Sequence, residues 1–282
     1  MLAILGGIGA AFCFGASTLC SSRSSRMIGA SSVVAWMMLI GLLALLPVVV
    51  LGGLPEQLDA GAGVWLILSA AGNVIGLLIV YAALRIEWVG IVAPITSTEG
   101  AVAALIAAAA GEAIGGGTGL ALAVMVVGVV LTGIVRAERQ EEHNHGRRGA
   151  LLALLSAACF GVGLYATGRV GSDLPIVWAV LPARVAGVLF VAIPLAVGSR
   201  LRLTRRALPL VVASGLAEVV GFASFAFGAR HGIAVSAVLA SQFAAVAAVG
   251  AYLLFGERPG RLQLIGVAMI LAGVAVLTGL TA

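Results

Sequence analysis

The sequence predicts an all-α polytopic membrane protein, with ten transmembrane helices in two inverted five-helix repeats. Of its 282 residues, 62% are hydrophobic and only 10% are charged, and the mean hydropathy is +1.19. A soluble fold of this composition would lack the polar residues needed to cover its surface. Apolar runs long enough to span a bilayer recur along the whole chain, and a bilayer span of this kind is helical.

Windows of about 20 apolar residues place the helices in order. The ten expected spans are about 2–20, 31–51, 64–84, 89–109, 117–135, 150–168, 176–197, 207–228, 233–255 and 262–280. Most connections are short, and the longest polar one is a charged linker at 136–149. We therefore expect a first repeat over 1–135 and a second over 150–282.

The two halves match each other at a constant offset of 145 residues, which indicates an internal repeat. Five helices is an odd number, so the second repeat would insert upside down relative to the first. That architecture gives a transporter two exchangeable conformations and places its site at the midplane. The matched pairs are Ser69 and Ser214, Gly76 and Gly221, Arg85 and Arg230, Glu112 and Glu257, and Gly128 and Gly273.

The basic residues predict orientation. The net charge is +5, and most arginines fall in short loops on the side of the charged linker. This pattern sets topology and does not suggest a nucleic-acid partner. The positive-inside rule places both termini outside the cytoplasm.

Four polar positions lie deep inside expected spans, where an ionisable group is expensive and is therefore a candidate functional residue. Glu99 and Glu218 lie halfway along their helices, Asn73 is the repeat mate of Glu218, and Arg184 lies within the seventh span. Arg184 could clamp a Glu structurally, or it could bind a substrate carboxylate while a Glu receives an amine or a proton. Glu99 could also be a protonated packing feature. The sequence leaves these alternatives open.

Further polar and aromatic residues extend this candidate substrate or proton site. Ser97 and Gln242 fall at matching depth in the fourth and ninth helices, and a buried amide such as Gln242 must satisfy several hydrogen bonds. Trp36, Tyr81 and Tyr165 lie within spans and could line a pocket, although lipid-facing or core packing explains each of them better when taken alone.

Residues at helix ends and crossings predict structural roles. Glu112 and Glu257 each follow a glycine and are expected to accept from the N–H groups that open the fifth and tenth helices. Gly128 and Gly273 are expected at tight helix crossings, because small residues let membrane helices approach closely.

Nothing in the sequence indicates an enzyme, a metal site or a cofactor. It contains no phosphate-binding glycine loop, no Ser/His/Asp set and no His or Cys cluster with metal spacing. His143 and His145 lie in the charged linker, where a solvated tract explains them better than a metal does. With no nucleotide-binding domain expected, active transport would draw on a gradient.

The sequence resembles the EamA-type transporters of the drug/metabolite transporter superfamily over essentially its whole length. The matching segments are Tyr81 through Glu112, with Val92-Ala93-Pro94, and Phe225 through Glu257. Each is followed by a Gly-rich last helix, and aromatic-Gly pairs stand at 14–15 and 160–161. The resemblance implies alternating access and efflux of amino acids, related metabolites or small drugs. It also implies cytoplasmic termini, against the arginine distribution.

We therefore expect a secondary transporter in the cytoplasmic (inner) membrane that moves a small amino acid-like metabolite or drug, with export the expected direction. The alternatives are a membrane-embedded binding or sensory subunit, and a translocator of lipid-linked precursors. The expected partners are a small-molecule substrate, protons and membrane lipid, with no nucleic acid. A monomer is sufficient in principle, and a dimer is compatible with the sequence.

Overall fold

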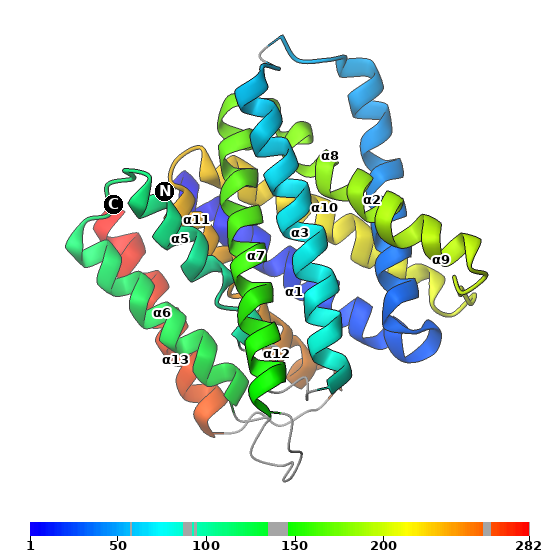
Figure 1. Ribbon diagram of the computed structural model, residues 1–282. Coiled ribbons are helices and arrows are strands. Elements are labelled where there is room, and N and C mark those ends of the chain that lie inside the picture. The colour runs from blue at the N-terminus through cyan, green and yellow to red at the C-terminus, as the bar shows by residue number, and fades with distance from the viewer. Residues whose placement is uncertain (57, 87–91, 93–94, 135–145, 256–260, 282) are drawn as a thin grey trace.

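The computed structural model describes residues 1–282 except 57, 87–91, 93–94, 135–145, 256–260 and 282. The described residues form helices and turns and contain no strand (Figure 1). Among them, six helices are long and apolar enough to cross a membrane, and four shorter helices are apolar. The expected all-α polytopic membrane architecture is thus confirmed, while the inverted repeat remains a prediction.

The first half of the chain contains five labelled helices. Their bounds are α1 Leu2–Ile28, α2 Ala30–Gly52, α3 Ala60–Ile86, α5 Glu99–Ala109 and α6 Gly116–Ile134. The second half is more interrupted. Its elements are α7 Gly146–Asp173, α8 Ile176–Gly187, a π-helical turn at Val188–Ala192, α9 Ile193–Val197, α10 Leu208–Ala229, α11 Ile233–Ala240, α12 Phe243–Phe255 and α13 Arg261–Thr281.

Two of the expected spans are interrupted by a polar turn. The ninth divides into α11 and α12 at Ser241-Gln242, and a turn at Ser97-Thr98 precedes α5. The side chains at both turns bond to nearby backbone: Ser241 Oγ donates to the Val238 carbonyl at 2.8 Å, and Thr98 Oγ1 donates to that of Ile95 at 2.7 Å. Hydroxyls that compete for backbone partners in this way weaken a helix locally.

Helices from opposite halves of the chain form the centre of the bundle. Helix α3 packs along α7, and α1 packs along α10. Each pair is joined by a buried hydroxyl bond, Ser69 to Thr167 at 2.7 Å and Ser17 to Ser214 at 2.8 Å. Such bonds satisfy polar side chains that the bilayer cannot.

Glycines allow the same two helix pairs to approach closely. A Cβ on Gly76 would lie 2.8 Å from a ring carbon of Phe160, and a Cβ on Gly221 would lie 2.6 Å from one of Phe14. Both phenylalanines therefore occupy space that only glycine leaves free. The two contacts correspond to each other in the two halves, because Gly76 is matched with Gly221 and Phe14 with Phe160.

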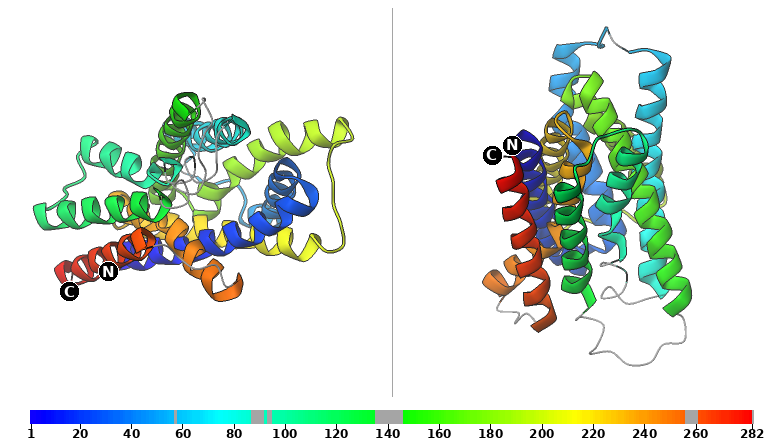
Figure 2. Two further views of the ribbon diagram at one scale, coloured as in Figure 1. Left: turned by 90° about the horizontal axis from the view of Figure 1, so that it is seen from below. Right: turned by 90° about the vertical axis from the view of Figure 1, so that its left-hand side faces the viewer.

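Helices α6 and α13 pair at one edge of the bundle, and α2, α8 and α9 lie at the other (Figure 2). Gly128 contacts α13, where a Cβ would lie 2.8 Å from the Gly266 carbonyl oxygen. A Cβ on Gly273 would collide with Met125 of α6. The expected close crossing at these two glycines is confirmed.

Glu112 caps a helix, but the prediction that it caps the fifth span, α6, is wrong. Glu112 Oε2 accepts from the Ile233 N–H and Oε1 from the Ala234 N–H, both at 3.1 Å, so this carboxylate caps α11 and not α6. Helix α11 has Gly232 as its N-cap residue, which supplies no side-chain acceptor. The carboxylate arrives instead from the other half of the chain. Glu257 lies outside the described residues.

Both termini lie at the same end of the bundle (Figure 1). The opposite end holds the end of α6, the start of α7 and the turn between α1 and α2. The last turn of α1, which contains Arg26, therefore lies at the end opposite the termini.

Candidate functional site

A cavity of about 450 Å³ lies inside the bundle. Its walls come mainly from α1 and α2, with contributions from α3, α5, α7, α10 and the start of α12. It reaches Ser25 and Ala30 at the turn between α1 and α2, where Ala30 is exposed. The cavity therefore extends from the bundle interior to the end opposite the termini. A volume of this size accommodates a small metabolite.

Two carboxylates line this cavity, Glu99 at the first turn of α5 and Glu218 in α10. Asn73 of α3 lies in the wall as well. Glu99 is partly buried, and the helix that begins with it directs its N-terminal dipole toward the carboxylate. Three of the four deep polar positions thus share one cavity. The remaining polar lining residues are Ser17, Thr18, Ser21, Ser22, Ser25 and Thr96.

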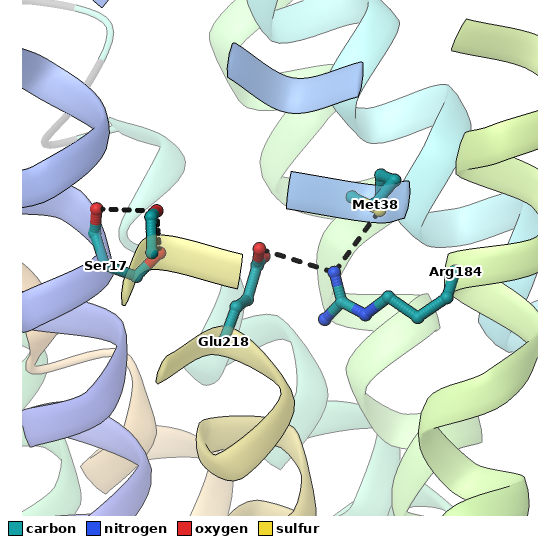
Figure 3. A network of polar contacts seen from close by, with 5 residues as sticks. Ser17, Met38, Arg184 and Glu218 are labelled. Atoms are coloured by element: carbon teal, nitrogen blue, oxygen red, sulfur yellow. Dashed lines mark hydrogen bonds and ion pairs between the residues drawn. The ribbon is translucent and has the colours of Figure 1, made fainter. Parts of the chain in front are cut away.

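The fourth deep polar position, Arg184, does not line the cavity but reaches the lining residues Glu218 and Met38 (Figure 3). Its side chain is fully buried, and Nη1 lies 3.3 Å from Glu218 Oε2 and donates to Met38 Sδ at 3.3 Å. Its Cζ lies 5.1 Å from the centre of the Phe222 ring, a cation–π distance. Arg184 therefore faces a carboxylate, a thioether and an aromatic ring.

This ion pair leaves several hydrogen-bonding groups unused. Arg184 Nε and Nη2 and Glu218 Oε2 have no hydrogen-bond partner among the described residues. Glu218 Oε2 thus lies at ion-pair distance from Arg184 Nη1 without accepting a hydrogen bond from it. Buried polar groups are almost always hydrogen-bonded, so an exception needs a reason.

The backbone around Arg184 is irregular. Pro182 lies inside α8, where its ring removes a helical hydrogen bond, and a π-helical turn follows at Val188–Ala192. Single π-turns inside helices are frequently found at functional sites. Opposite, a Cβ on Gly41 would lie 3.0 Å from Arg184 Cδ, so α2 approaches the arginine stem through a glycine.

Aromatic rings complete the wall. Phe14 and Phe222 pack edge to face with centroids 5.0 Å apart, and Phe14 and Phe243 do so at 6.4 Å. Phe160 lines the cavity from α7. Aromatic, aliphatic and hydroxyl surface thus surround the two carboxylates.

Ser97 and Gln242 are not among the residues that line the cavity. Both are buried at the polar turns that interrupt the fourth and ninth spans. Gln242 Nε2 donates to the Val238 carbonyl at 2.7 Å, while its Oε1 has no hydrogen-bond partner in the described part of the chain. Both residues therefore lie at helix interruptions and not in the cavity wall.

Two of the three predicted aromatic residues lie elsewhere. Tyr165 is buried and packs edge to face on Trp65 with centroids 5.7 Å apart. Trp36 Nε1 donates to the Arg202 carbonyl at 3.0 Å. The side chain of Tyr81 lies outside the described residues. The rings that line the cavity are phenylalanines instead.

A row of hydroxyl groups on α1 also lines the cavity, and it was not predicted from the sequence. Thr18, Ser21, Ser22 and Ser25 follow Ser17 along one helix face and all line the cavity. Their spacing was visible in the sequence, since residues four apart share a helix face. Among the described residues, no group of three or more His, Cys, Asp or Glu side chains could hold a metal ion.

Comparisons with known proteins agree with this architecture. A crystal structure with 19% sequence identity superposes with a TM-score of 0.82, covering 99% of this chain and 96% of that one, which shows a shared fold. No curated protein matches the sequence. The family model described as "EamA-like transporter family" matches twice, at residues 1–134 and 147–279. The chain therefore belongs to the EamA-like transporter family.

Proposed function

We propose that this protein is a secondary transporter that exports a small metabolite across the cytoplasmic membrane by alternating access. The observation that carries the proposal is the cavity of about 450 Å³ that holds Glu99 and Glu218 inside an otherwise apolar bundle. Carboxylates within a membrane are expensive and mark substrate or proton pathways. The roles of Glu99, Glu218, Asn73 and Arg184 are part of this proposal.

We further infer that the two halves are inverted repeats that rock against each other. The contacts between α3 and α7 and between α1 and α10 support this inference, because each joins the third span of one half to the first span of the other. So do the two separate family matches. The cavity described above would be the state open toward the turn between α1 and α2, which the arginine-rich loops assign to the cytoplasm.

Untargeted metabolite profiling tests the proposal. Cells that overproduce the native protein are compared with cells that carry an empty vector and with cells that produce Glu99→Gln at equal membrane abundance. We expect a few metabolites to rise in the medium with the native protein only. Accumulation inside the cells would show uptake instead of export. Unchanged pools with folded protein in the membrane would contradict a transport function.

A further inference from the structure

The hydroxyl groups along the cavity have already committed their protons. Thr18 donates to the Phe14 carbonyl at 2.7 Å, Ser21 to that of Thr18 at 3.2 Å, and Ser25 to that of Ser22 at 2.8 Å. A hydroxyl carries one proton and two acceptor lone pairs. Each of these three side chains therefore offers the cavity an acceptor and no donor.

Two more lining hydroxyls are committed in the same way. Thr96 donates to a backbone carbonyl at 2.9 Å. Ser214 donates to the Ser17 carbonyl at 3.1 Å, so Ser17 supplies the proton of the 2.8 Å bond between their hydroxyls. Among the described lining residues, only the Ser22 hydroxyl and the Asn73 amide keep an uncommitted side-chain donor. The cavity is rich in acceptors and poor in donors.

The charged groups of the wall, like its hydroxyl groups, favour a ligand that donates hydrogen bonds and carries positive charge. Glu99 and Glu218 are its two ionisable groups, and no arginine or histidine lies in the described lining. Arg184 neutralises Glu218 from behind and is fully buried. Within the described residues Glu99 has no ion-pair partner. The site as a whole thus carries one carboxylate more than it has cations to balance.

Four phenylalanine rings give this negative site an aromatic surface. Phe14, Phe160, Phe222 and Phe243 line the cavity together with aliphatic side chains such as Leu77. The face of an aromatic ring attracts cations, and Phe222 already shows this toward Arg184. Aromatic rings also offer large apolar surfaces for packing.

Building on the proposed transport function, we propose that the substrates of this cavity are monocationic amines with an aromatic or aliphatic body. The ammonium group binds Glu99 and donates its remaining protons to the hydroxyl oxygens of α1. The apolar body packs among the phenylalanine rings. One positive charge on the ligand balances the one uncompensated carboxylate of the site.

Zwitterions and anions fit this site poorly. A ligand carboxylate would face Glu99 and a row of acceptor oxygens, and like charges repel most strongly where water is excluded. Arg184, the cation paired with Glu218, has none of its side chain exposed. A carboxylate could reach the guanidinium only after Glu218 had moved away. The structure therefore selects against amino acids with an intact carboxylate.

Isothermal titration of the purified full-length protein tests this inference with four probes that share a phenethyl body. These are 2-phenylethylamine, phenylalanine, 3-phenylpropanoate and trimethyl(2-phenylethyl)ammonium. We expect 2-phenylethylamine to bind at least about tenfold more tightly than the zwitterion and the anion, because a charge-assisted hydrogen bond is worth at least that factor. The trimethylated probe keeps the charge without N–H donors and should bind more weakly than the primary amine.

Two variants test whether Glu99 is the group that binds the amine. Glu99→Gln should reduce the affinity for 2-phenylethylamine by at least about tenfold. Glu56→Gln removes the same charge from an exposed loop and should leave the affinity unchanged. Size-exclusion chromatography checks that each variant is folded. If Glu99→Gln does not fold, the comparison of the four probes on the native protein decides the question. Equal binding of all four probes, tighter binding of the zwitterion or anion, or no binding of any probe would overturn the inference.

The failure of this inference is distinguishable from that of the proposed function. If 2-phenylethylamine binds selectively while metabolite profiling finds no change in any pool, the substrate class stands and transport fails. If cells export metabolites that contain no cationic amine, transport stands and the substrate class is overturned.

Discussion

Glu218 Oε2 lies 3.3 Å from Arg184 Nη1, yet that oxygen and the Nε and Nη2 groups of the arginine find no hydrogen-bond partner among the described residues. A buried ion pair stabilises a fold only when its remaining hydrogen bonds are made, because desolvation of both charges opposes their attraction. This pair is therefore a poor structural clamp. Under the proposed alternating access, this contact would break and reform as the cavity changes its opening.

Removing one member of this pair should destabilise the protein strongly. Arg184→Met keeps the apolar stem and leaves the Glu218 carboxylate without its cation, so we expect a loss of about 3–5 kcal/mol in unfolding free energy. Glu218→Gln should also destabilise, because it leaves the guanidinium buried without a counter-ion. Chemical unfolding in detergent measures both effects.

The double variant is the control for a direct interaction. Arg184→Met combined with Glu218→Gln removes both charges together, so it should be less destabilised than the sum of the single variants. Additive losses in this double-mutant cycle would mean that the two side chains stabilise the protein independently, against the close contact in Figure 3.

Glycine at position 221 should be required for the packing of α1 on α10. Gly221→Ala places a methyl group 2.6 Å from the Phe14 ring, so the ring or the helix must move. Overpacking of this kind costs about 1–3 kcal/mol. Thermal unfolding should show the loss, and Phe14→Leu in the same chain should restore part of it.

A second glycine provides the matched control. A Cβ on Gly63 in α3 meets no atom within 4 Å, so Gly63→Ala should change stability by less than about 1 kcal/mol. Gly76→Ala, which would press on Phe160, should behave like Gly221→Ala. Equal tolerance at positions 63 and 221 would contradict the close approach.

Much of this architecture follows from the sequence because burial in lipid leaves few options. Apolar runs of bilayer length must be helices, and Gly128 and Gly273 lie at the crossing that their small size predicted. Glu99 and Glu218 were identifiable by depth alone, because an ionisable group in that position is expensive.

The direction in which individual side chains point could not be predicted from the sequence in the same way. Trp36 and Tyr165 look like pocket residues in the sequence, but one bonds to a loop carbonyl and the other packs on Trp65. In an almost wholly apolar helix the hydrophobic pattern does not distinguish lipid from a neighbouring helix. The partner of Glu112 was missed because it lies 121 residues away, at the start of α11.

The carboxylate of Glu112 should hold the start of α11. Glu112→Ala leaves the Ile233 and Ala234 N–H groups without their acceptor, which should cost about 0.5–2 kcal/mol, as the loss of a helix cap does. Glu112→Gln keeps one acceptor oxygen and should lose less. Thermal unfolding compares both with Glu56→Ala, which removes an exposed carboxylate. No difference between positions 112 and 56 would contradict the cap.

Glu99 should couple the movement of substrate to that of protons. Its carboxylate faces the cavity beside Glu218, which Arg184 neutralises, so one proton or one bound cation can occupy Glu99 but not both. Competition of this kind converts a proton gradient into substrate flux. In proteoliposomes, a pH gradient should drive accumulation of the substrate by the native protein, measured with the metabolite that profiling identifies. Glu99→Gln should exchange substrate slowly and ignore the gradient, while Glu56→Gln should respond as the native protein does. Native transport that is indifferent to the gradient would exclude this coupling and leave the protein a facilitator.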